Sequence, residues 1–191
     1  GQRIWGTYFG GSNQDKGYSV TCGPFGNIFI TGSTRSNSSI ASSGAHQSSH
    51  GGGSVDVFIA KFNSLGQRIW STYYGGSGQE YAYYCDIATD NSGFVYISGE
   101  TSSTYGLVTP GAYQTSLSGY VDAFFSKFNT NGQRVWGSYF GGTNSDGGMG
   151  VVVDSMKNVY ITGSTNSSSG IATFRAHQQN YGGAGSFGGD A

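Results

Sequence analysis

One segment rich in aromatic residues and glycine occurs three times in this sequence. It reads GQRIWGTYFGG at 1–11, GQRIWSTYYGG at 66–76 and GQRVWGSYFGG at 132–142. A catalytic motif is needed only once, whereas a segment that returns at a nearly constant interval belongs to a repeated structural unit. The chain therefore divides into repeat units 1–65, 66–131 and 132–191, and the last unit is truncated.

Four strand-like runs recur within each unit. In the first unit they cover residues 4–9, 18–22, 27–32 and 56–63, where aromatic and β-branched residues are abundant. Short clusters of Asp, Asn, Ser and Gly separate most neighbouring runs and predict tight hairpin turns. A longer connection rich in Ser, Gly and Asn, residues 33–55, joins the third run to the fourth. Each unit thus predicts antiparallel strands and one long loop.

Both faces of the predicted strands are apolar. Phe58 and Phe62 face one side of the run at 56–63, and Val57 and Ile59 face the other. A small sheet that is apolar on both faces must be covered on both sides. Radial stacking of four-stranded sheets meets this need, and it defines a β-propeller. We therefore predict an all-β fold of propeller-type blades, with one four-stranded antiparallel sheet per repeat of about 65 residues.

Several segments resemble a known bacterial family, the beta-propeller repeat often called the SBBP repeat. The matching segments are TPGAYQ at 109–114, DAFFSKFN at 122–129, WGSYFGG at 136–142, VD at 153–154 and NVYITG at 158–163. The resemblance implies a propeller in a large secreted or surface-exposed bacterial protein, often with adhesion-like modules, and it brings no catalytic residue with it. The first repeat departs from the family pattern at Gly23-Pro24, where the family has an acidic turn.

By analogy with other propeller repeats, the run at 18–22 is innermost and the Trp-containing run is outermost. On this register the chain begins with one blade's outer strand, contains two complete blades and ends within a third. We expect Trp5 and Phe9 to pack toward one neighbour, and Ile4 and Tyr8 toward another. About four blades is the usual minimum for a closed ring. The remaining blades would therefore come from a longer chain or from further copies of this one.

Composition excludes several classes of partner. Charged residues make up 10% of the chain and the net charge is −1, so the basic footprint of a nucleic-acid-binding protein is missing. No apolar run approaches the roughly 20 residues of a membrane span, so we expect no membrane insertion. Cys22 and Cys85 lie on apolar runs. One disulfide is open to them, but we favour buried free thiols, because non-disulfide Cys is among the most buried residue types.

Three acids follow the Gly-Gly pair at one repeated spacing: Asp15, Glu80 and Asp146. Together they could contact a cation or a polar ligand. Alternatively, each carboxylate satisfies backbone N–H groups in the Gly-rich crossover. We favour the second interpretation, because a residue present in every repeat most simply serves the repeat. Among the acids outside these repeated positions are Asp86 and Glu100.

His46 and His50 form the one pair that suggests a metal. On a helix their spacing would present both to one ion, but here it falls in a Ser/Gly loop. His46 also aligns with Tyr113 and His177 of the other repeats. We therefore predict no metal site and no cofactor. A G-x-G-x-x-G pattern at 183–188 lacks the preceding strand and following helix of a dinucleotide site and is rejected.

The long connections differ most among the repeats and carry the candidate ligand-binding residues. These are Tyr105, Tyr120, Arg175 and Tyr181. Loops on a rigid scaffold are where binding usually resides. Exposed Tyr among Ser, Gly and Asn suits carbohydrate or polar surfaces. The alternative is that these loops simply pack over the blade edges.

These observations lead us to expect a non-enzymatic structural or interaction module, of the adhesion type, in a secreted or cell-surface bacterial protein. Its partners would be the remaining blades, and a polysaccharide or another surface protein. The alternative is a lectin-like propeller that binds polysaccharide between blades or on a loop face. A third hypothesis, a fragment of a propeller enzyme, has only Asp86 and Glu100 available among the non-repeated acids.

Overall fold

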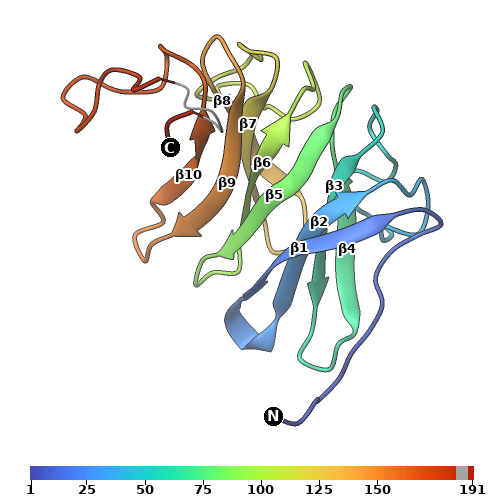
Figure 1. The fold of residues 1–191 in the computed structure, drawn as a ribbon. Helices are drawn as coiled ribbons and strands as arrows, with labels where there is room; N and C mark the ends of the chain where they lie inside the picture. Colours follow the sequence, from blue (N-terminus) through green and yellow to red (C-terminus); the bar gives the residue numbers. More distant parts are fainter. Residues whose placement is uncertain (184–188) are drawn as a thin grey trace.

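The computed structural model describes residues 1–183 and 189–191, and these residues form three antiparallel sheets (Figure 1). The first sheet contains β1 (Asp15–Cys22), β2 (Ile28–Thr34), β3 (Asp56–Phe62) and β4 (Arg68–Tyr74). The second contains β5 (Glu80–Thr89), β6 (Val95–Thr101), β7 (Asp122–Phe128) and β8 (Arg134–Phe140), and the third contains β9 (Asp146–Val153) and β10 (Val159–Thr165). In the four-stranded sheets, spatial order follows chain order. The predicted all-β fold with four-stranded antiparallel sheets is confirmed.

The sheets lie side by side in an arc, with each inner strand next to the preceding sheet (Figure 1). β5 packs against β1, β2 and β3, and β9 packs against β5, β6 and β7. The long connections and the crossovers between sheets share one end of the strands, which we call the crossover end. The β1–β2 and β3–β4 hairpins lie at the opposite, hairpin end. In the described residues, no helix is long and apolar enough to span a bilayer.

Asp and Asn side chains shape the hairpins by accepting hydrogen bonds from the backbone of the turn. Asp90 Oδ1 accepts from the N–H groups of Ser92 and Phe94, at 2.8 and 3.0 Å. Asn63 Oδ1 does the same in the β3–β4 hairpin. Gly66 closes that hairpin with a φ of 77°, which side-chain-bearing residues rarely adopt. The local sequence thus specifies these turns directly.

The main core lies between the first two sheets. It contains Phe29, Val57, Ile59, Trp70 and Tyr74 from the first sheet, and Cys85, Ile87, Val95, Ile97, Phe124, Phe128 and Tyr139 from the second, with Leu107. A smaller cluster of Ile40, Phe58 and Tyr73 covers the other face of the first sheet. Phe58 and Ile59 therefore serve opposite faces, as their alternation predicts.

The prediction of an outer strand at 4–9 is wrong, because residues 1–14 form no strand. The equivalent strands β4 and β8 each pair with the strand before them. Among the described residues, no strand lies beside residues 4–9 to pair with their backbone groups.

Two of the four side chains expected to pack, Trp5 and Phe9, do contact the first sheet. Trp5 donates its indole N–H to the carbonyl of Ser64 at 3.1 Å. The Phe9 ring lies 4.9 Å from that of Phe58. Ile4 and Tyr8, expected to pack toward a second neighbour, are exposed.

Both cysteines are free, but only Cys85 is buried. The predicted burial of Cys22 is wrong. Cys22 pairs with Ile28 at the hairpin end of β1, and it points away from the second sheet. No other sheet of the described residues covers that face, whereas Cys85 lies between two sheets beside Thr31.

Candidate functional site

The repeated acids occupy the first residue of each inner strand, where the chain enters a new sheet. Each carboxylate accepts a hydrogen bond from the backbone N–H of the second glycine in the preceding Gly-Gly pair. The distances are 2.7 Å for Gly11 to Asp15, 3.2 Å for Gly76 to Glu80 and 2.6 Å for Gly142 to Asp146. The carboxylates therefore fasten the crossovers to the sheets that follow.

Hydroxyl groups next to the second strand of each sheet complete this arrangement. Thr101 and Ser103 both donate to Glu80 Oε1, the threonine at 2.9 Å. Thr165 and Ser167 donate to the Asp146 carboxylate in the same way. Each acid is thus held by the crossover on one side and by the end of the second strand on the other.

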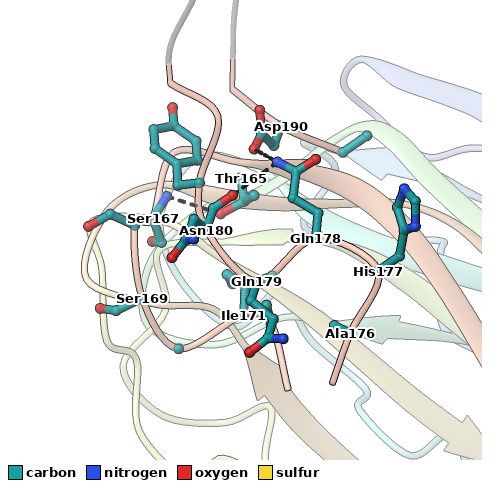
Figure 2. A pocket seen from close by; sticks show the side chains of 15 residues that line it. Thr165, Ser167, Ser169, Ile171, Ala176, His177, Gln178, Gln179, Asn180 and Asp190 are labelled. Atoms are coloured by element: carbon teal, nitrogen blue, oxygen red, sulfur yellow. Dashed lines mark hydrogen bonds between the residues drawn. The ribbon is translucent and has the colours of Figure 1, made fainter. Parts of the chain in front are cut away.

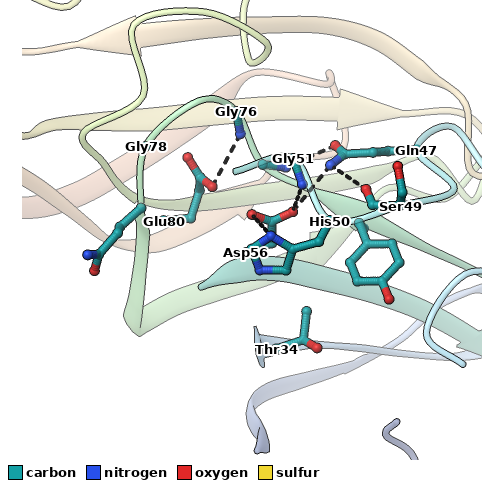
Figure 3. Close-up of polar contacts among 12 residues, drawn as sticks. Thr34, Gln47, Ser49, His50, Gly51, Asp56, Gly76, Gly78 and Glu80 are labelled. Carbon is teal, nitrogen blue, oxygen red and sulfur yellow. Dashed lines mark hydrogen bonds and ion pairs between the residues drawn. The ribbon is translucent and has the colours of Figure 1, made fainter. Parts of the chain in front are cut away.

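A second set of repeated acids begins the third strand of the two four-stranded sheets, at Asp56 and Asp122, and the equivalent Asp190 forms an isolated bridge with Thr165. Asp56, Asp122 and Asp190 each accept a hydrogen bond from a loop N–H and from a glutamine side chain. Figure 3 shows this arrangement for Asp56, and Figure 2 shows the contact of Asp190 with Gln178. The glutamine distances are 3.2 Å for Gln47, 2.9 Å for Gln114 and 2.9 Å for Gln178. Through its amide oxygen, Gln47 also accepts from Gly75 N, and Gln114 from Gly141 N.

These glutamines were not among the predicted site residues. Their signal was present in the repeated Ala-His/Tyr-Gln triplet, in which the glutamine is the invariant polar member of the three repeats. The glutamine ties the long connection to the third strand and to the crossover, because one amide supplies both a donor and an acceptor.

Asp56 and Glu80 place their carboxyl groups on either side of Gly75. A Cβ added to Gly75 would lie 2.3 Å from Asp56 Cγ and 2.5 Å from Glu80 Oε2. Both side chains are fully buried. Burial, with a smaller contribution from the charge of Asp56, raises the pKa of Glu80 to about 8, against the hydrogen bonds that Glu80 accepts, which lower it. Burial also raises the pKa of Asp56, against opposing contributions from Gly51 N–H and His50.

The buried Oδ1 atom of Asp56 has no hydrogen-bond donor, although the His50 ring lies 3.5 Å away (Figure 3). Two ionised carboxylates can only accept, so a single proton shared with Glu80 would satisfy both groups. Asp122 and Asp146 flank Gly141 in the same manner, and burial raises the pKa of Asp122 as well. The geometry favours a structural pair that is protonated once.

The two non-repeated acids do not meet in one cleft. Asp86 accepts from the Ser19 hydroxyl at 2.6 Å and from Val151 N–H at 2.9 Å, and so links the inner strands of all three sheets. Glu100 lines a hollow beside Tyr81 between the second and third sheets, and burial raises its pKa. Asp86 thereby has a clear structural role.

The predicted ligand-binding residues lie at separate places. Tyr105 is 69% exposed beside the crossover at Gly76, and Tyr120 is 90% exposed beside the next crossover. Arg175 is exposed, with its guanidinium 5.3 Å from the Phe174 ring. Tyr181 lines an open hollow together with Gln178 and Asp190 (Figure 2). In residues 1–183 and 189–191, the four side chains therefore do not surround a single site.

The two loop histidines serve packing contacts. The His46 ring lies edge-on to Phe128 at 5.8 Å, and burial lowers its pKa. His50 faces Asp56. The described part of the chain contains no group of three or more His, Cys, Asp or Glu side chains arranged to hold a metal. Apart from Gly183, the G-x-G-x-x-G pattern at 183–188 lies outside the described residues.

Four-stranded antiparallel sheets that stack through their faces and are joined by fastened crossovers define the blades of a β-propeller. The chain belongs to the SBBP beta-propeller repeat family, whose pattern matches residues 4–38, 69–106 and 135–170. The predicted resemblance is thereby confirmed. The chain is also similar to the regulatory protein FlaEY of Caulobacter vibrioides, with 23% identity over 158 residues. That alignment covers 81% of this chain and 16% of FlaEY.

Proposed function

We propose that this chain is a non-enzymatic interaction scaffold of the adhesion type. One observation carries the proposal: the repeated carboxylates are engaged in fastening crossovers and loops, as Glu80 shows with Gly76, Thr101 and Ser103. Polar groups that appear in every blade thus serve the blade. The groups that vary and remain exposed are loop side chains such as Tyr105 and Tyr120, which suit contact with a partner.

A secreted or cell-surface location follows from the same proposal, with the further blades and another surface protein as partners. Weakly charged, Gly- and Ser-rich loops on a rigid frame suit repeated contacts outside the cell. The similar FlaEY protein carries the name of a regulatory protein, and a regulatory role is compatible with binding rather than catalysis.

A lectin-like role is the second candidate. Exposed Tyr105 and Tyr120 stand among Ser, Thr and Gly residues. Such surfaces combine a flat apolar ring with hydrogen-bonding groups, and both suit a sugar.

Protease shaving of intact cells followed by immunodetection tests the location. Loss of the protein from intact cells supports the proposal, and loss only after lysis overturns it. A glycan array and a surface-protein panel then test the partner, comparing the wild type with Tyr105→Ala/Tyr120→Ala. Tyr113→Ala is the matched control, since Tyr113 is an exposed tyrosine outside the candidate set. A specific hit that survives loss of both tyrosines excludes the loop-face site.

A further inference from the structure

A hollow opens between the first and second blades at the crossover end, on the side of the inner strands. Lys16, Tyr18 and Arg35 line it from the first blade, and Gln79, Tyr81 and Tyr83 line it from the second. None of these residues belongs to the loop-face set described above. Lys16 and Arg35 are also two of the few basic residues that do not recur at equivalent positions of the other repeats.

A bulge in β5 shapes this hollow. Each inner strand departs from its ladder at the same place: Tyr18 is the extra residue in β1 and Met149 in β9. In β5 the departure is larger, because residues 82–85 stand opposite Gly99 alone. Bulges of this kind redirect side chains and are common beside binding sites. Here the bulge leaves Tyr83 61% exposed, with its ring 6.3 Å from that of Tyr18.

The cations of the hollow have no acidic partner. Among residues 1–183 and 189–191, the single ion pair joins His50 to Asp56. Lys16 Nζ instead lies 5.7 Å from the centre of the Tyr83 ring, and both Lys16 and Arg35 are exposed. Glu80 also lines the hollow, but its buried carboxyl group is engaged by Gly76, Thr101 and Ser103. Two unpaired positive charges beside two tyrosine rings are therefore available to a ligand.

We propose that this hollow binds a uronic-acid residue of a polysaccharide, so that the blade-to-blade seam itself is a carbohydrate subsite. Lys16 and Arg35 supply charge-assisted hydrogen bonds to the sugar carboxylate. The rings of Tyr18 and Tyr83 supply faces for the apolar side of the pyranose. The side-chain amide of Gln79, which makes no hydrogen bond within the described residues, is free for a hydroxyl group. A nucleic acid is disfavoured because the chain carries a net charge of −1.

The seam between the second and third blades provides an internal comparison. Its hollow occupies the equivalent place and is lined by Tyr81, Glu100 and Asn166 among others. Tyr81 stands where Lys16 stands in the first blade, and Glu100 stands where Ser33 stands. No Lys or Arg that the structure describes lines that hollow, and Glu100 adds an acidic group to it. The chemistry predicts one uronate subsite per chain, at the first seam.

The test is titration calorimetry of the chain with three probes: trigalacturonic acid, a hyaluronan tetrasaccharide and an alginate trimer. Methyl-esterified trigalacturonate serves as the neutral counterpart, and acetate as the bare carboxylate. Lys16→Gln/Arg35→Gln is compared with Arg68→Gln/Lys157→Gln, which changes the net charge equally at exposed positions of the hairpin end. Tyr83→Ala tests the ring face, and circular dichroism verifies that each variant folds.

We expect one site for at least one uronate probe, with Kd raised about 10- to 100-fold in Lys16→Gln/Arg35→Gln and unchanged in the hairpin-end control. Tyr83→Ala should weaken the sugar but not acetate. Absence of binding to all three uronates, equal binding of the methyl ester, or an unaffected Kd in Lys16→Gln/Arg35→Gln would overturn the proposal. The proposal rests on the interaction role above but can fail separately. Uronate binding that is lost only in Tyr105→Ala/Tyr120→Ala rejects the seam and keeps the lectin-like role.

Discussion

Asp56 and Glu80 come from neighbouring blades, yet their carboxyl groups meet around Gly75 without access to water. Two buried carboxylates this close cannot both remain ionised at little cost, so we expect the folded chain to hold a proton that the unfolded chain releases above pH 4.5. Burial first, and then the charge of Asp56, raise the pKa of Glu80 from an ordinary 4.5 to about 8. Asp56 and Glu80 should therefore make the stability of the contact between the first two blades depend on pH.

Replacing Glu80 with Gln should flatten the dependence of stability on pH. A carboxyl group whose pKa is raised on folding contributes most below its unfolded value, and that contribution is lost as pH rises from 4.5 toward about 8. The wild type should therefore lose up to about 4 kcal/mol of unfolding free energy over this window. The Glu80→Gln variant should lose much less, because the amide stays neutral and can donate to Asp56.

Urea unfolding at pH 5, 6, 7 and 8 measures this difference. Asp154→Asn is the control: Asp154 is partly exposed in a hairpin, and hydrogen bonds from Asn158 lower its pKa, so its titration falls below the window. A Glu80→Gln variant that keeps the wild-type slope between pH 5 and 8 would show that the pair does not hold a proton.

At the scale of elements, the local sequence predicts the strands and turns, and the Gly-Gly pairs mark the crossovers between sheets. The Asp and Asn residues of the hairpins were identifiable because they act on their own turn, as Asp90 does. The crossover glycines were read only as points where the chain changes sheet. The structure adds that Gly75 and Gly141 must lack a side chain, because a carboxyl pair occupies the space beside each.

Gly75→Ala should destabilise the chain by about 3 kcal/mol, since the new methyl group would overlap the buried Asp56 and Glu80 side chains. Gly17→Ala is the matched control. Gly17 also lies at the crossover end, but a Cβ there meets nothing within 4 Å. We expect that variant to match or slightly exceed the wild type. Equal stability of the two variants in urea titrations would contradict the packing seen around Gly75.

At the scale of the molecule, contacts between neighbouring blades provide much of the stability, and they differ from blade to blade. The largest core lies between the first two blades. Asp86 in β5 accepts hydrogen bonds from β1 and from β9, the inner strands of the two adjacent blades. The third blade has β9 and β10 and a single bridge from Thr165 to Asp190. In stacked repeats each unit is stabilised mainly by its contacts with adjacent units. A blade packed against more neighbours should therefore be better protected from hydrogen exchange.

Rates of amide hydrogen exchange in this 191-residue chain should therefore differ between the blades. We expect β6 to exchange far more slowly than β10, although the two strands read VYISGET and VYITGST. Residues 1–14 and 166–183, which form no strand, should exchange fastest. Mass spectrometry of peptic fragments would measure this order. Equal protection of β6 and β10 would mean that interblade contacts do not govern local stability.

Apart from the strand wrongly predicted at 4–9, the sequence alone determined the repeat, the family, the strand content, the turn residues and the order of strands within a blade. Each of these depends on interactions within one unit, so periodicity and turn chemistry reveal them. It did not disclose the glutamine links, the carboxyl pairs or the β5 bulge, because these require knowledge of which blade lies beside which. Tyr96 is 1% exposed and its counterpart Tyr160 is 54% exposed. The tertiary structure decided that difference, since burial belongs to a residue's neighbours rather than to its own sequence.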